Sequence, residues 1–236
     1  MKRATQADWL RSAENSEAYI AKMGAIPENQ LRWSKVHDDV GAWISKFGTT
    51  GNLLDVGCRR GELMRSKSFP PTIVYFGIDP LRIDGQNEFN FRCETLETTS
   101  FPDAMFDFVI IKDSFDYFLE PRKALAAAFR LLKPGGYFLL TEGGHPSERV
   151  PRWKTVLRTA KGYARAVIKR DYRALRRQKA FNAESIYPNG DIPTSDILGY
   201  CKEAGFLIVG NDISGGRLFL AAIRPVSKAG TQKAPR

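Results

Sequence analysis

The most informative stretch of this chain is Leu53-Leu54-Asp55-Val56-Gly57-Cys58-Arg59-Arg60-Gly61-Glu62-Leu63. An apolar run ends at an acidic residue, and a turn with two glycines leads into what the pattern indicates is the start of a helix. Proteins of the α/β class build a nucleotide cradle in this way at the carboxyl end of their first strand. The glycines let the backbone approach a ligand closely, because neither carries a Cβ atom. The stretch therefore predicts a strand, a ligand-binding turn and a helix.

A second strand of the same kind follows, with the sequence Thr72-Ile73-Val74-Tyr75-Phe76-Gly77-Ile78-Asp79-Pro80. It also ends at an acidic residue. A carboxylate at the tip of the second strand accepts hydrogen bonds from the hydroxyl groups of a ribose. Asp79 is therefore the leading candidate for a ligand-binding residue.

Two further motifs follow in the order that one large family shows. Phe106-Asp107-Phe108-Val109 lies in an apolar run that predicts a fourth strand, and Leu132-Lys133-Pro134-Gly135-Gly136 precedes a fifth. With D-x-G-C-x-x-G, F-D-x-V and L-K-P-G-G signatures, the chain resembles the class I S-adenosylmethionine-dependent methyltransferases, closely over 50–142 and more loosely over 193–223. The resemblance implies an α/β fold with a Rossmann-like seven-stranded sheet. This sheet is mostly parallel with an antiparallel last strand, carries helices on both faces and has an inserted basic helical lid.

The resemblance and the apolar periodicity together divide the chain into three parts. Residues 1–48 are expected to form an N-terminal helical cap. Residues 49–223 are expected to form the methyltransferase domain, interrupted by a basic helical segment at 145–192. Residues 224–236 are polar and contain two prolines, which predicts a disordered tail.

Apolar periodicity also places the individual elements. The cap is expected to hold helices at 5–24 and 30–47. The strands before the insertion are expected near 52–56, 73–78, 88–91, 106–111 and 136–141. Pro121 opens a helix between the last two of these strands. After the insertion we expect a helix capped by Thr194-Ser195-Asp196 and ended by Gly205, followed by strands at 206–209 and 217–223.

The composition indicates a single α/β domain with an appended subdomain. The chain has 236 residues, of which 43% are hydrophobic, enough for a sizeable core. Its three cysteines are scattered without metal-ligand spacing. We expect neither a signal peptide, because residues 1–9 are charged and lack an apolar segment, nor a membrane span, because no apolar run reaches the length of about 18 residues that a span needs. We therefore expect a cytoplasmic protein without a metal site, which disfavours the magnesium-dependent route of catechol-type enzymes.

The positive charge of the chain is concentrated in one segment. Residues 149–180 contain 12 Lys and Arg but only one acidic residue, so this window carries +11 and the rest of the chain −1. Apolar residues at helical spacing across 150–181 predict a basic amphipathic helix. It is interpreted in four ways: a lid packed on the domain, contact with an anionic membrane surface, recognition of a phosphorylated or carboxylated substrate, or binding of nucleic acid. If the segment contacts a membrane, we expect a peripheral membrane protein. Nucleic acid binding is less favoured than the other three interpretations.

The resemblance implies that S-adenosyl-L-methionine is the cofactor. In the family, an acid like Asp55 orients the glycine turn or meets the amino-acid part of the cofactor, and one like Asp79 binds the ribose. Cys93-Glu94-Thr95-Leu96 falls where relatives bind adenine, and the residues after the fourth strand lie at the lip of the pocket. The expected cofactor-binding residues are Asp55, Gly57, Cys58, Gly61, Asp79, Pro80, Glu94, Thr95, Lys112 and Asp113.

The glycine turn departs from the family pattern at one position. Arg59 stands where the usual D-x-G-x-G-x-G motif has its middle glycine. Either its side chain points away from the cofactor or the loop shifts. Arg59 and Arg60 face the cofactor carboxylate or form a solvated basic pair.

Two histidines are candidates for the catalytic machinery. His145 follows the fifth strand on the substrate side, where an imidazole can deprotonate a hydroxyl group, or it is a loop histidine bonded to backbone. His37, on the second N-terminal helix, is a weaker candidate for the same mouth.

The residues after the fourth strand bear on the acceptor. Amino-methyltransferases of nucleic acids carry an Asn or Asp followed by Pro-Pro and an aromatic residue there, and this chain has Lys112-Asp113-Ser114 instead. We therefore expect methylation of a small or lipid-linked acceptor, at oxygen rather than nitrogen. The alternatives are a tRNA or rRNA methyltransferase that uses the basic lid, and a non-catalytic S-adenosylmethionine-binding protein.

Overall fold

The computed structural model describes most of the chain outside its basic segment. The described residues are 14, 17–18, 21, 24–84, 86–143, 192–214 and 216–226. The predictions for His145, for the basic segment 150–181 and for the tail beyond residue 226 therefore lie outside the described residues. Within the described part of the chain, no helix is long and apolar enough to cross a membrane.

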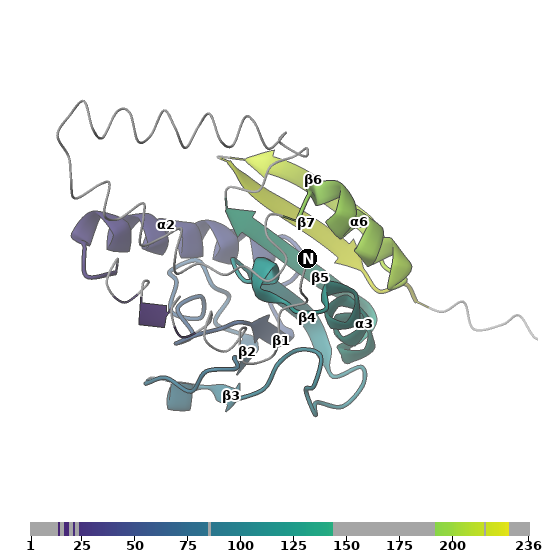
Figure 1. Cartoon of the computed structure of the whole chain (residues 1–236), viewed down its shortest axis with the longest axis horizontal. Helices are drawn as coiled ribbons and strands as arrows, with labels where there is room; N and C mark the ends of the chain where they lie inside the picture. Colours follow the sequence, from purple (N-terminus) through teal and green to yellow (C-terminus); the bar gives the residue numbers. More distant parts are fainter. Residues whose placement is uncertain are drawn as a thin grey trace, which may run out of the picture.

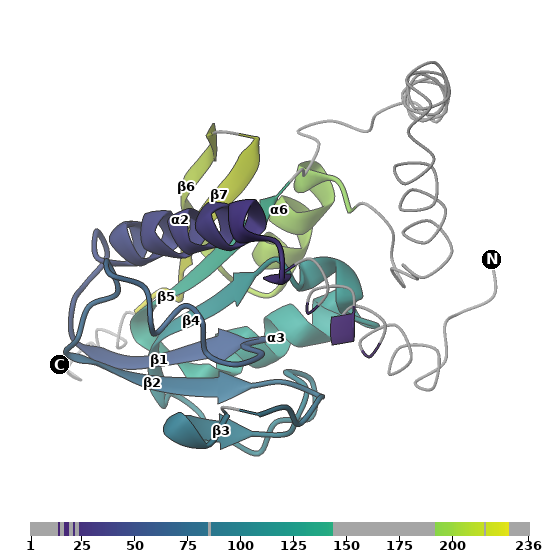
Figure 2. The ribbon, with the colours of Figure 1, turned by 90° about the vertical axis from the view of Figure 1, so that its left-hand side faces the viewer.

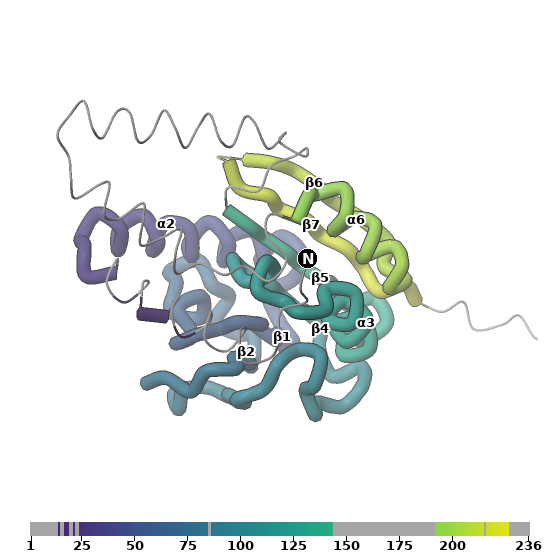
Figure 3. Tube along the Cα trace, viewed as in Figure 1, coloured from purple at the N-terminus to yellow at the C-terminus, as the bar shows by residue number. Residues whose placement is uncertain are grey.

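Seven strands form one sheet, in the order β3-β2-β1-β4-β5-β7-β6. Their bounds are Gly51–Val56 (β1), Ile73–Ile78 (β2), Asn90–Arg92 (β3), Phe106–Lys112 (β4), Leu132–Gly143 (β5), Leu207–Ser214 (β6) and Arg217–Ile223 (β7). β7 runs antiparallel to both of its neighbours, while the pairings among β1 to β5 are parallel. Figure 3 shows the chain path, with β3 at one end of the sheet and the β6–β7 hairpin at the other. The predicted seven-stranded sheet with an antiparallel last strand is confirmed.

Helices cover both faces of this sheet (Figures 1 and 2). In the described part of the chain, these helices are α2 (Pro27–Ile44), α3 (Pro121–Leu131) and α6 (Thr194–Glu203), with short 3-10 turns at Gln86–Glu88 (η1) and Phe115–Tyr117 (η2). Successive side chains of a strand point to opposite faces, so each strand contributes to two cores. Leu53 and Ile110 pack with α2, whereas Leu54 and Ile111 pack with α3 and α6.

Local structure departs from the sequence predictions at three places. Residues 57–72 form successive turns after β1 instead of the expected helix, and the crossover ends at Pro70-Pro71, which disfavours helix. At α6, Pro193 is the N-cap and no side chain caps the helix, because Thr194 already belongs to its first turn. β6 extends to Ser214, well beyond the predicted end of that strand, as the partner of the whole of β7.

The end of the domain also extends past the predicted boundary at residue 223. The backbone N–H of Arg224 donates to the carbonyl of Gly136 at 2.9 Å. Its guanidinium donates to the carbonyls of Phe129, Arg130 and Leu132, at the end of α3. Arg224 thus closes the carboxyl end of this helix and is an ordered part of the fold.

The parallel register brings the carboxyl ends of three neighbouring strands together. Val56 of β1 pairs with Ile78 of β2 on one side and with Ile111 of β4 on the other. The loops that follow these strands therefore begin at one edge of the sheet, where open α/β sheets bind ligands.

Candidate functional site

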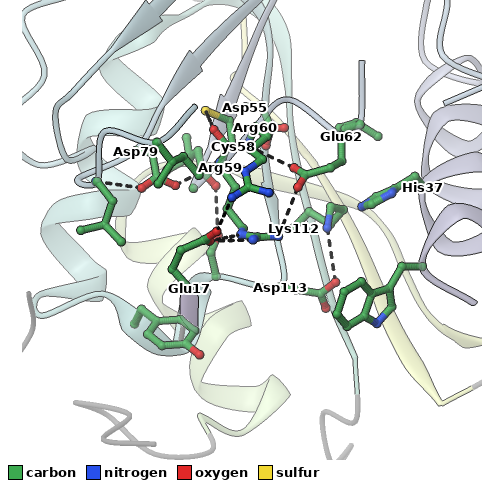
Figure 4. A pocket seen from close by; sticks show the side chains of 18 of the residues that line it. Glu17, His37, Asp55, Cys58, Arg59, Arg60, Glu62, Asp79, Lys112 and Asp113 are labelled. Carbon is green, nitrogen blue, oxygen red and sulfur yellow. Dashed lines mark hydrogen bonds and ion pairs between the residues drawn. The ribbon is translucent and has the colours of Figure 1, made fainter. Parts of the chain in front are cut away.

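A cavity of about 1030 Å³ opens at this edge (Figure 4). Nine of the ten predicted cofactor-binding residues line it, namely Asp55, Gly57, Cys58, Asp79, Pro80, Glu94, Thr95, Lys112 and Asp113. Gly61, the tenth, is not among the lining residues. Loops that are far apart in the sequence thus meet around one space, which is large enough for a dinucleotide-sized ligand.

The two glycines of the first turn have different reasons for being glycine. Both have a positive φ, +74° at Gly57 and +73° at Gly61, which disfavours other residues. A Cβ atom on Gly57 would lie 2.8 Å from the side chain of Ser114, on the loop after β4. A Cβ atom on Gly61 would lie 2.7 Å from the ring of Phe89. Gly57 therefore allows two cavity loops to approach each other, and Gly61 serves the packing behind the turn.

Arg59 adopts the left-handed conformation that the family's glycine would permit, with φ +48°. Its backbone N–H donates to Oδ2 of Asp79 at 3.0 Å. Its guanidinium contacts Glu17 at 2.6 Å and Glu62 at 3.2 Å, and Arg60 reaches the other oxygen of Glu17 at 3.2 Å. The loop therefore keeps a glycine-like course while the side chain turns to the N-terminal part of the chain.

Asp79 is buried at the end of β2, with 6% of its surface exposed. Its Oδ2 accepts from the N–H of Arg59, and its Oδ1 accepts from the N–H of Leu81 at 2.9 Å. Burial raises the pKa of Asp79, and these two hydrogen bonds oppose the shift. Each oxygen keeps a second lone pair, so the carboxylate can also accept from the two hydroxyl groups of a ribose.

Asp55 lies deeper, at the end of β1. The hydroxyl of Tyr75 donates to its Oδ2. Burial raises the pKa of Asp55 to about 6, while the hydrogen bond from Tyr75 and the positive charge of Lys112 act in the opposite direction. Beside it, burial also raises the pKa of the Cys58 thiol, so this cysteine is a small apolar wall of the cavity rather than a nucleophile.

Glu94 lines the cavity, but its carboxylate is engaged by its own loop. It accepts from Oγ1 of Thr99 at 2.8 Å and from both N–H and Oγ of Ser100. Burial acts to raise the pKa of Glu94, and the bonds from Ser100 and Thr99 lower it overall. The side chain thus shapes the turn, and the polar backbone of this loop is left for ligand recognition.

The loop after β4 forms the opposite wall with a cluster of charged residues. Asp113 has φ +54°. Its Oδ1 accepts from the guanidinium of Arg217 at 2.7 Å and from the N–H of Gly143 at 2.9 Å. Burial acts to raise the pKa of Asp113, but the positive charges of Lys112 and Arg217 lower it overall. Asp113 is therefore the ionised partner of two cations.

Glu142 of β5 binds the backbone of the same loop. Its Oε1 accepts from the N–H of Ser114 at 3.0 Å and of Phe115 at 2.6 Å. Burial raises the pKa of Glu142 well above its usual range, and the nearby carboxylates of Asp113 and Asp116 add to the shift. The buried acid is driven towards its neutral form and acts as a fixed acceptor for the loop.

His37 projects from α2 towards this wall, beside Lys112 (Figure 4). Burial lowers the pKa of His37 to about 4, and the positive charge of Lys112 adds to the effect. The imidazole is therefore neutral at physiological pH. Its place in the cavity agrees with the expectation that it faces the mouth.

Three residues of the site were not predicted from the sequence. Glu17 and Arg217 bind residues 42 and 104 positions away. Gln86 is buried behind the turn, where its side-chain amide donates to the carbonyl of Arg59 at 2.8 Å and its oxygen accepts from Ile83. No local motif marks these positions, because their contacts with Arg59 and Asp113 are made only in the tertiary structure.

Comparison with known proteins gives one family match and one curated relative. A family model described as "Methyltransferase domain" matches residues 29–184. A fatty-acid O-methyltransferase of Mycolicibacterium smegmatis is 31% identical over an alignment of 119 residues, and the match covers 46% of this chain and 42% of the relative. The alignment thus spans less than half the length of that relative.

Solved structures show the same fold. An O-methyltransferase family protein from Burkholderia thailandensis matches with a TM-score of 0.59 and 18% identity, over 95% of this chain and 64% of that one. A phosphoethanolamine N-methyltransferase of Haemonchus contortus, in complex with S-adenosyl-L-methionine, matches with a TM-score of 0.54 and 16% identity, over 77% and 51%. A protein of Bacillus halodurans, also described as a methyltransferase, matches with a TM-score of 0.56 and 16% identity, over 80% and 99%.

Proposed function

The chain belongs to the methyltransferase-domain family, among the class I S-adenosylmethionine-dependent enzymes, and we propose that it methylates an oxygen atom of a small or lipid-linked acceptor. The observation that supports the proposal is the cavity at the carboxyl ends of β1, β2 and β4, which contains the turn after Gly57 and the buried carboxylates of Asp55 and Asp79. When bound, S-adenosylmethionine supplies an electrophilic methyl group on a sulfonium sulfur. The residues of the chain then have to bind, orient and shield the reactants from water.

The lining residues fit this cofactor from one end to the other. Asp79 keeps a lone pair on each oxygen for the ribose hydroxyls, and Pro80 closes the same end of the cavity. Gly57 lets the turn after β1 and the loop after β4 approach each other at the edge of the cavity. Asp55, once ionised, can bind the amino group of the methionine part. The loop at Thr95 binds the adenine. Its backbone provides the polar contacts, because the Glu94 carboxylate already accepts hydrogen bonds from Thr99 and Ser100.

Two observations support oxygen as the methylated atom. The loop after β4 has Lys112-Asp113-Ser114 in place of the motif that binds an exocyclic amine in nucleic acid amino-methyltransferases. In addition, the relative from Mycolicibacterium smegmatis is named as an O-methyltransferase. For a hydroxyl acceptor, His145 is the proposed general base, in a part of the chain outside the described residues.

A transfer assay with a labelled methyl group tests the proposal. The purified protein is incubated with methyl-labelled S-adenosylmethionine and with separate pools of long-chain alcohols, phenols, carboxylic acids, amines and tRNA. We expect label in an organic-soluble oxygen-methylated product. Label in tRNA alone, lost steeply as salt rises, would support the alternative of a nucleic acid methyltransferase. Cofactor binding without transfer to any pool would support a non-catalytic protein.

A further inference from the structure

The wall of the cavity opposite Asp79 is positively charged. Lys112 and Arg217 flank one ionised carboxylate, Asp113, and only 17% and 16% of their side chains are exposed. Arg217 binds Asp113 closely, at 2.7 Å. Among the described residues the carboxylate nearest to Lys112 is the same Asp113, at a looser 3.5 Å. The carboxylate of Glu62 is also close enough to act on the pKa of His37, but it accepts a hydrogen bond from the guanidinium of Arg59 at 3.2 Å.

Lys112 therefore holds a largely buried ammonium group whose one ion pair among the described residues, with Asp113, is long at 3.5 Å. An ammonium group has three N–H donors, and a buried cation without close acceptors is unfavourable. Its charge lowers the pKa of both Asp55 and His37, so Lys112 lies between the cofactor turn and α2. An anionic group bound here would lie beside the methionine end of the proposed cofactor site.

The cavity that Lys112 lines also has apolar side chains in its walls. Trp33 and Val36 of α2 line the cavity from one side, and Tyr117 and Phe118 line it from the end of η2. His37 stands next to Lys112 and, being neutral, contributes an N–H donor without adding charge. The cavity thus combines a cation and a donor on this wall with apolar side chains elsewhere in its lining.

We infer that Lys112 binds the carboxylate of an apolar-tailed carboxylic acid and that this carboxylate is the methyl acceptor. The inference rests on the proposed function and assigns Lys112 to the acceptor instead of the cofactor. An alcohol would add no negative charge to the single carboxylate, Asp113, that lies within 4 Å of the ammonium among the described residues, and an alkylammonium group would be repelled by the ammonium. The site therefore selects acids both by attraction and by repulsion of the alternatives.

The reaction at such an acceptor needs no general base. A carboxylate oxygen supplies the electron pair for the new O–CH₃ bond, while the S–CH₃ bond breaks and its electrons stay on sulfur. The products are a methyl ester and S-adenosylhomocysteine, and no proton is released. An alcohol acceptor would release one proton for each methyl transferred. Proton release therefore distinguishes the two classes of acceptor.

The test compares decanoate, 1-decanol and decylamine, which share a chain length and differ in the head group. For the wild type we expect methyl decanoate without proton release in weakly buffered medium, and little product from the other two. Lys112→Met removes the charge and keeps the length of the side chain. It should weaken decanoate binding to the S-adenosylhomocysteine complex about 10- to 100-fold, since hydrogen bonds to charged groups are strong.

Two controls separate this inference from other roles of Lys112. In Lys112→Met, the affinity for S-adenosylhomocysteine, measured at pH 8 to keep Asp55 ionised, should stay within threefold of wild type, because the side chain serves the acceptor. Lys123→Met removes an exposed lysine of α3 that pairs with Glu120, and it should leave decanoate binding unchanged.

Several results would overturn the inference. An equal loss of affinity for S-adenosylhomocysteine and decanoate in Lys112→Met would return Lys112 to the cofactor site. Methylation of 1-decanol with proton release, and not of decanoate, would overturn the carboxylate acceptor while the proposed function stands. Failure of the wild type to bind S-adenosylhomocysteine would overturn both.

Discussion

The left-handed backbone at Arg59 leads to a prediction about a pair of variants, Arg59→Gly and Arg59→Ala. Both variants remove the guanidinium and therefore lose the same contacts with Glu17 and Glu62. Both keep the backbone N–H that donates to Asp79. They differ only in the residue that has to adopt φ +48°. The difference between their stabilities thus reports on the backbone of the cofactor turn.

The magnitude follows from two opposing terms. A left-handed conformation costs a residue with a Cβ atom about 1–2 kcal/mol, and glycine does not have this cost. Glycine in turn makes the unfolded chain more flexible, which lowers the stability of the variant by about 0.4–1 kcal/mol. Arg59→Gly should therefore be more stable than Arg59→Ala by about 1 kcal/mol. For a domain of this size that difference corresponds to about 2–4 °C in the melting temperature.

Differential scanning calorimetry of the two variants and the wild type measures this difference. Glu17→Gln serves as the matched control, because it removes the ion pair and leaves the residue at position 59 unchanged. Its loss of stability should be about 1 kcal/mol, in the range of a partly exposed ion pair. If Arg59→Ala proves as stable as Arg59→Gly, residue 59 does not adopt the left-handed conformation and our account of the turn is wrong.

Two further predictions concern Asp55 and Gly61. Burial raises the pKa of Asp55 to about 6, so its carboxyl is protonated below that pH. The affinity for S-adenosylmethionine, measured by calorimetry, should therefore rise from pH 5 to 7 and then level off. Asp55→Asn should remove most of this pH dependence, and an unchanged pH profile in this variant would exclude Asp55 from binding the amino group. Gly61→Ala should lower the free energy of unfolding in urea by about 2–3 kcal/mol, because its Cβ atom would lie 2.7 Å from Phe89 at φ +73°. Gly199→Ala on α6, where a Cβ atom meets nothing within 4 Å, should instead stabilise by about 0.5–1 kcal/mol, and similar losses in both would contradict the packing argument.

The parts of the site that are local in sequence could be predicted from it. The strand that ends at Asp55 and the strand that ends at Asp79 are short apolar runs bounded by turn residues, and such patterns determine where a strand stops. Parallel pairing then brings the carboxyl ends of neighbouring strands together whatever the side chains are. The positions of the glycine turn and of Asp79 at one edge of the sheet follow from these two facts, whereas the seven-stranded sheet was expected from the resemblance to the methyltransferase family.

The remaining features depend on contacts that no local pattern records. The crossover after β1 has a glycine turn typical of a helix start, yet Leu63 and Phe69 are buried through a series of turns instead. Glu17 binds Arg59, which lies 42 positions further along the chain. Arg217 binds Asp113 because β7 returns antiparallel beside β5.

Calorimetric titration with S-adenosylmethionine, of the wild type, Asp79→Asn and Asp103→Asn, tests the cofactor site most directly. Asp79→Asn keeps the shape of the side chain but removes its charge and one acceptor oxygen. Asp103→Asn changes an exposed carboxylate that pairs with Arg130. We expect micromolar 1:1 binding to the wild type and to Asp103→Asn, and binding about 10- to 100-fold weaker to Asp79→Asn. Absence of binding to the wild type, or equal affinity in Asp79→Asn, would contradict the account.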